Sequence, residues 1–117
     1  MSHVTTVEVE FKDLEALEVA ASSLGAEFKR ADQVRFMDGS TVSGASVKLR
    51  GWPYPVVVQG KKLHMDNYEG RWGNPADIDR LKQAYAVQVA RKHARQHGFR
   101  VRETQASDGT VRLVLAK

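Results

Sequence analysis

Apolar and polar side chains alternate at the start of the chain. This period of two predicts a half-buried β-strand over about residues 3–11. Its apolar members are Val7, Val9 and Phe11. Apolar residues then recur at intervals of three and four, which predicts an amphipathic helix from Leu14 to Leu24. Asp13 is placed to cap that helix and Gly25 to end it.

Short apolar runs separated by turn residues occupy the middle of the chain. A first run, Val34–Met37, leads into a turn signal at residues 38–39. Pro53 and Pro55 exclude a central strand over residues 51–55. Three further runs predict short strands, at Val47–Arg50, Val56–Gln59 and Leu63–Tyr68.

The longest helical pattern begins near Pro75 and ends at His97. Asn74 can cap its first turn, and Gly98 follows its last residue. The buried face begins with large apolar residues and continues with alanines, so the helix can approach a sheet closely. That face consists of Ile78, Leu81, Tyr85, Ala86, Val89, Ala90 and Ala94.

Two alternating segments around a turn signal at residues 108–109 predict a closing β-hairpin. A three-residue loop pairs Leu113 with Glu103. It also pairs Leu115 with Val101, which keeps both apolar side chains on one face. We therefore expect a loop of odd length, with a bulge at the glycine of the turn. The outer face of the hairpin then carries Arg100, Arg102 and Arg112.

Together these elements predict an α+β fold. Short strands joined by tight turns favour a mostly antiparallel sheet, and two amphipathic helices on one face of it give a two-layer sandwich. Residues 1–117 are expected to form a single α+β domain, because domains most often have about 100–150 residues and no linker or repeat interrupts this chain.

Composition removes several classes of protein. The chain is 42% apolar and contains no cysteine, which excludes disulfides, thiolate metal sites and cysteine nucleophiles. No apolar run approaches the ~20 residues of a membrane span. The first residues lack the basic and apolar regions of a signal peptide. We therefore expect a cytoplasmic protein with no membrane contact.

The net charge of +4 is unevenly distributed. Residues 1–32 sum to −4, residues 33–74 to +3, and residues 75–102 to +5. From Arg80 to Arg102 there are seven basic residues and no acidic one. Such a stretch is typical of a solvated helix face, and it can also attract nucleic acid, an acidic protein or anionic lipid.

Aromatic residues gather in the middle of the chain among basic ones. Tryptophan and tyrosine are favoured at protein interfaces and can stack on bases, although they can equally seal loops onto the core. The resulting candidates for contact with a partner or nucleic acid are Trp52, Tyr54, Trp72, Arg91, Arg95, Arg100 and Arg102.

Candidate chemistry is limited to one pair of histidines. His93 and His97 lie four residues apart on the long helix, a spacing that lets two imidazoles share a metal. No acidic residue lies close enough in sequence to complete the set of ligands, and the pair also borders the apolar face. No phosphate-binding glycine motif or nucleophile elbow occurs. The sequence therefore predicts no cofactor and no catalytic residue.

Five segments of the chain match a known pattern, namely Met1–Val7, Lys12–Leu17, Leu81–Ala86, Gly98–Val101 and Asp108–Leu115. These segments resemble a family of small proteins of unknown function from cyanobacteria, other bacteria and plastids, the hypothetical chloroplast reading-frame thirty-five family. The resemblance implies a cytoplasmic or stromal protein without assigned catalysis, accessory to an AAA-type ATPase. No functional residue carries over from the family.

Three functions follow as hypotheses. The first is a non-enzymatic binding or adaptor protein, accessory to a larger assembly. The second is nucleic-acid binding through the basic helix and the outer face of the hairpin. The third is a small metal-dependent protein that uses His93 and His97. A homodimer is compatible with all three, because an edge strand and exposed aromatic residues favour pairing between copies.

Overall fold

The computed structural model describes residues 4–66, 73–105 and 111–116. Strands and helices alternate in the order that the sequence predicts, which confirms the α+β class. In this part of the chain the elements are β1 (Val4–Glu8), α1 (Leu14–Ser23), β2 (Glu27–Arg35), β3 (Thr41–Lys48), β4 (Val56–Gln59), β5 (Lys62–Asp66), α2 (Pro75–Gln96), β6 (Arg100–Gln105) and β7 (Val111–Ala116).

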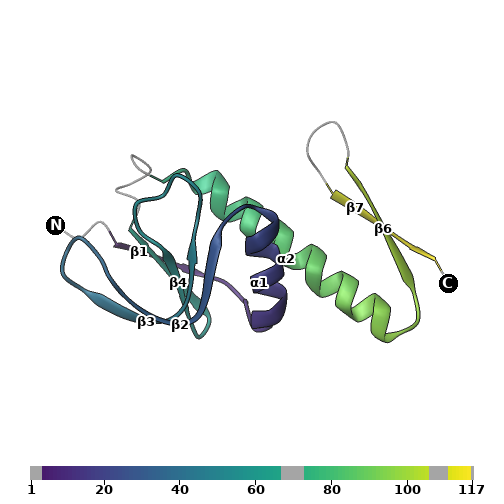
Figure 1. The fold of residues 1–117 in the computed structure, drawn as a ribbon, viewed down its shortest axis with the longest axis horizontal. Coiled ribbons are helices and arrows are strands. Elements are labelled where there is room, and N and C mark those ends of the chain that lie inside the picture. Colours follow the sequence, from purple (N-terminus) through teal and green to yellow (C-terminus); the bar gives the residue numbers. More distant parts are fainter. Residues whose placement is uncertain (1–3, 67–72, 106–110, 117) are drawn as a thin grey trace.

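The first five strands form one antiparallel sheet in the order β1-β5-β4-β3-β2 (Figure 1). Strands β2 to β5 lie side by side in the order of the sequence. Strand β1 forms the edge of the sheet next to β5, with Val4 opposite Asp66. Helix α1 therefore carries the chain from one edge of the sheet to the other. Asp13 caps this helix as predicted, since its carboxylate accepts a hydrogen bond from the Ala16 amide at 3.1 Å.

The main core lies between the two helices and the sheet. Leu17 of α1 and Leu81 of α2 are fully buried in it, and burying a leucine side chain is worth about 1.5–3 kcal/mol. Val9 and Phe11 also belong to this core, although β1 ends at Glu8 and not at the predicted residue 11. The sheet contributes Ala45, Val47, Val56, Val58, Leu63 and Met65.

A second, smaller core covers the other face of the sheet. Val57 points away from the helices and packs with Val34 and Phe36, so β2 curls over this face. Gly44 permits the bend, because a Cβ there would overlap the carbonyl oxygen of Val58. The apolar pattern of the sequence does not predict the full length of β2 and β3. Many positions of these two strands are exposed and interrupt the alternation of apolar residues.

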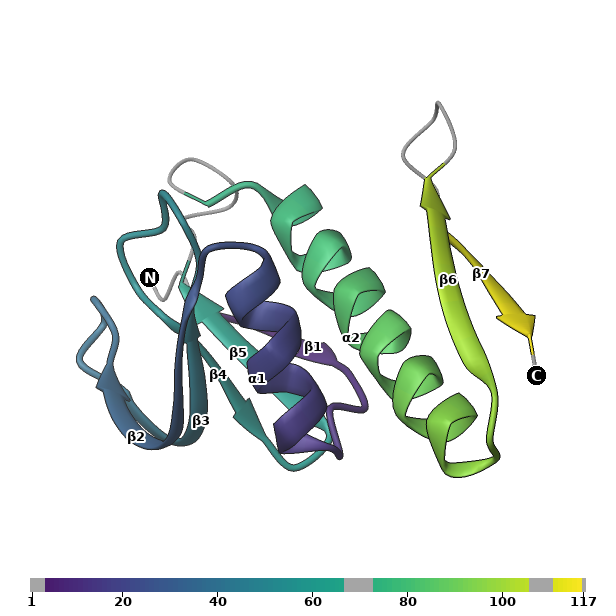
Figure 2. The ribbon, with the colours of Figure 1, turned by 45° about the vertical axis from the view of Figure 1, so that its right-hand side comes forward.

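The hairpin of β6 and β7 stands apart from the five-stranded sheet, on the far side of α2 (Figure 2). Its register is the predicted one, with Val101 opposite Leu115 and Glu103 opposite Leu113. The predicted bulge in the turn lies outside the described residues. The hairpin lengthens the molecule, which measures 53 × 30 × 22 Å. Within the described ranges, no helix is long and apolar enough to cross a membrane.

Candidate binding surface on the C-terminal arm

Helix α2 is fixed at both ends by its own sequence. The Asn74 side chain accepts a hydrogen bond from the Ala76 amide at 3.0 Å, and Pro75 occupies the first turn. At the other end Gly98 adopts a φ of 77°, which lets the Phe99 amide reach back to the Ala94 carbonyl at 2.9 Å. The chain reverses here, so the hairpin returns alongside α2.

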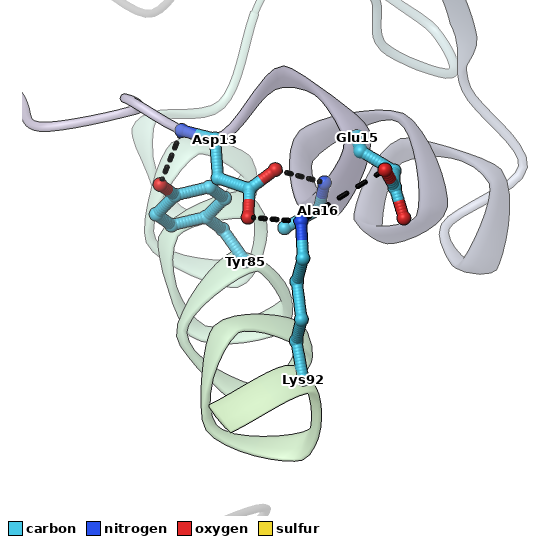
Figure 3. Close-up of polar contacts among 5 residues, drawn as sticks. All are labelled: Asp13, Glu15, Ala16, Tyr85 and Lys92. Atoms are coloured by element: carbon cyan, nitrogen blue, oxygen red, sulfur yellow. Dashed lines mark hydrogen bonds and ion pairs between the residues drawn. The ribbon is translucent and has the colours of Figure 1, made fainter. Parts of the chain in front are cut away.

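Two regions can therefore be distinguished. The body comprises residues 4–85, and the C-terminal arm comprises residues 86–116, which are the second half of α2 and the hairpin. Figure 3 shows the polar contacts that join α2 to the start of α1. The Tyr85 hydroxyl accepts a hydrogen bond from the Asp13 amide at 3.0 Å, and Lys92 Nζ lies 2.9 Å from Asp13 Oδ2.

The Asp13–Lys92 pair is electrostatically coupled. The hydrogen bond from Lys92 holds the pKa of the Asp13 carboxyl below its ordinary value, with help from the Ala16 amide. The same bond raises the pKa of Lys92. Lys92 Nζ also lies 3.8 Å from a carboxylate oxygen of Glu15. Lys92 is therefore an internal contact of the molecule, although it belongs to the basic stretch.

Three arginines of the arm are exposed, namely Arg95, Arg100 and Arg102. None of them forms an ion pair with a carboxylate in the described ranges. Arg91, the fourth predicted contact arginine, is half-buried and has contacts of its own. Arg80, at the start of the basic stretch, is 2.8 Å from Asp77. The arm thus carries the exposed arginines of the basic stretch that form no ion pair within the described residues.

The two described aromatic candidates, Trp52 and Tyr54, pack in the body and do not join these arginines. Trp52 is 2% exposed and belongs to the main core, where its indole nitrogen donates to Asp77 Oδ2 at 2.9 Å. Its ring is therefore part of the core, and a contact between Trp52 and a partner stays a prediction. Tyr54 is half-buried and packs edge-on against Phe36, with ring centroids 6.3 Å apart. Trp72 lies outside the described residues.

The two histidines of the arm do come together. The rings of His93 and His97 are exposed and their centroids are 4.4 Å apart. The described part of the chain contains no group of three or more histidine, aspartate or glutamate side chains that could hold a metal ion. The pair by itself offers two nitrogen ligands, so metal binding here stays a prediction.

Sequence reasoning misses a second surface feature, a cleft in the body beside Tyr85. Basic residues of two different segments line it, Lys61 and Lys62 on one side and Lys82 on the other. Residues that are 20 positions apart give no common sequence signal. Only the packing of α2 against the edge of the sheet brings them together.

Comparison with models of known protein families, with characterised proteins and with solved structures gives no match.

Proposed function

We propose that the protein is a non-enzymatic binding protein, an adaptor that docks on an acidic surface of a larger assembly through its C-terminal arm. The observation that supports this proposal is the exposure of Arg95, Arg100 and Arg102 on the arm. Two other basic residues of the stretch, Arg80 and Lys92, are by contrast paired with Asp77 and Asp13. Exposed arginines that form no ion pair within the described part of the chain can steer and orient the approach of a negatively charged surface.

The nature of the assembly is a further part of the proposal. The resemblance to a small cyanobacterial and plastid family supports an AAA-type ATPase as the partner and the cytoplasm or stroma as the compartment. The arrangement of the elements is compatible with such a role, because the five-stranded sheet and its helices form a packed body and α2 extends from it to the hairpin (Figure 1).

Affinity capture with the full chain tests the proposal. The arm variant R95E/R100E reverses two exposed charges, and the control variant K29E/R35E reverses two exposed charges on β2. We expect wild type and control to retain the same partner, identified by mass spectrometry. With the purified partner, the arm variant should bind at least tenfold more weakly. Equal binding by both variants, or no partner in repeated captures, would contradict the proposal.

Nucleic-acid binding is the second candidate, because the same three arginines are spread over α2 and β6. Each phosphate contact should add about 0.9 to the salt slope on duplex DNA. A gel-shift titration at low salt measures this directly. The absence of a shift at micromolar protein excludes this candidate. The acidic N-terminal third of the chain makes it the weaker of the two.

A further inference from the structure

A cleft in the body lies apart from the arm. It has a volume of about 830 Å³ and opens between the end of β1, the turn from β4 to β5, and α2. Figure 2 shows the segment after β1 curving between the sheet and α2. Small-molecule sites in proteins have volumes of about 300–1,000 Å³. The lining residues are Val9, Glu10, Phe11, Lys61, Lys62, Lys82 and Tyr85.

Backbone contacts position the lysines of the β4–β5 turn. Gly60 supplies the positive φ of this turn, at 60°, and Lys61 and Lys62 follow it directly. The Val9 amide donates to the Lys61 carbonyl at 2.9 Å, which ties the turn to the segment after β1. Lys82 approaches from the second turn of α2. Two separate parts of the fold, the β4–β5 turn and α2, therefore bring three lysines to one cleft.

The charge of the cleft favours an anion. Within the described residues, none of the three lysines forms an ion pair. Among the described lining residues Glu10 is the one acidic side chain, so these residues have an excess of two positive charges. Lysine ammonium groups bind phosphate oxygens as mobile point charges. A ligand with several negative charges would therefore neutralise this excess.

Phe11 and Tyr85 supply an apolar wall to the cleft, and their rings are held in place. The rings of Phe11 and Tyr85 meet edge to face, with centroids 4.9 Å apart. The Tyr85 hydroxyl is fixed by the Asp13 amide. The ring of Tyr85 thus offers a positioned surface to an organic group attached to the anion.

We propose that this cleft binds the phosphate chain of a small phosphorylated molecule. The phosphates lie against Lys61, Lys62 and Lys82, and the rest of the ligand faces the wall of Phe11 and Tyr85. This site is independent of the contact surface on the arm.

Isothermal titration calorimetry on the full chain tests the site with three probes, ATP, inorganic triphosphate and AMP. We expect saturable 1:1 binding of ATP and of triphosphate, and at least tenfold weaker binding of AMP. Tighter binding of ATP than of triphosphate assigns the apolar wall to the nucleoside. Equal affinity of the two assigns the site to the phosphate chain alone.

Matched variants locate the binding. K61Q/K82Q should weaken ATP binding at least tenfold, whereas K29Q/R35Q, which removes two exposed charges from β2, should leave it unchanged. R95E/R100E should also bind ATP normally, which separates this site from the arm. Circular dichroism confirms that each variant is folded, and K62Q alone provides a milder second test. Absence of saturable binding, or equal losses in K61Q/K82Q and K29Q/R35Q, would overturn the proposal.

Discussion

The body and the C-terminal arm are organised differently, although α2 runs through both. In the body, the two helices and five strands enclose a core in which Leu17, Val47 and Leu81 are fully buried. In the arm, β6 and β7 pair with each other and contact α2. A two-stranded hairpin is at best marginally stable on its own. The stability of the hairpin therefore depends on its contacts with α2, and the stability of α2 depends on its packing in the body.

The basic residues of the stretch from Arg80 to Arg102 differ in the same way. Arg80 and Lys92 form ion pairs with Asp77 and Asp13 of the body, whereas Arg95 and Arg100 are exposed on the arm. Stability and recognition should therefore respond to different substitutions. Changes in the body should lower the free energy of unfolding, and changes on the arm should alter binding at nearly constant stability.

The largest expected effect is that of Leu81→Ala in the main core. Removing a fully buried leucine side chain costs about 2–5 kcal/mol, because a cavity remains. The matched control on the arm is Val114→Ala, at a position that is 36% exposed, and it should cost less than about 0.5 kcal/mol. Urea denaturation of both variants measures the difference. Similar losses for the two would show that body and arm are equally packed.

A smaller effect is expected for Gly44→Ala, at the bend of the sheet. The added Cβ overlaps the Val58 carbonyl oxygen, which is backbone and cannot rotate away. β3 and β4 must therefore shift, at a cost of about 1–3 kcal/mol. Gly39→Ala is a useful contrast, because its φ of 87° strains an added side chain although the space around it is open. A Gly44→Ala variant of wild-type stability would contradict this account of the bend.

The sequence predicts most of this architecture, because periodicity and caps are local signals. α1, α2 and the hairpin register follow from residues close together in the chain, such as Asp13, Asn74 and Val101. The separate position of the hairpin, the curl of β2 and the burial of Trp52 do not follow. Each depends on contacts between residues far apart, such as the bond from Trp52 to Asp77, 25 positions away.

Trp52→Phe tests whether Trp52 contributes to the stability of the body and not to binding. Phenylalanine keeps most of the apolar contacts but loses the hydrogen bond to Asp77 Oδ2. We expect a loss of about 1–2 kcal/mol in the free energy of unfolding and no change in binding through the arm. Thermal denaturation and a binding titration measure the two quantities. Impaired binding at wild-type stability would instead make Trp52 a contact residue.

The smallest effect on stability should come from Asp13→Asn, at the joint between α1 and α2. Asparagine still caps α1, so this change removes mainly the charge that pairs with Lys92. The two side chains are 29% and 37% exposed, and solvent screens the pair. We expect the melting temperature at pH 7 to fall by roughly a few degrees at most.

The pH dependence of the difference in melting temperature between wild type and Asp13→Asn identifies the cause of that difference. The pKa of Asp13 is lower in the folded chain, so its contribution is present above the ordinary value of 3.8 and is lost as the pH falls through the folded pKa. The pKa of Lys92 is raised, so its contribution is complete below 10.5 and is lost at higher pH. Melting curves of wild type and Asp13→Asn should therefore converge at both extremes. A difference that stays constant from pH 3 to pH 7 would mean that the charge of Asp13 does not stabilise the joint.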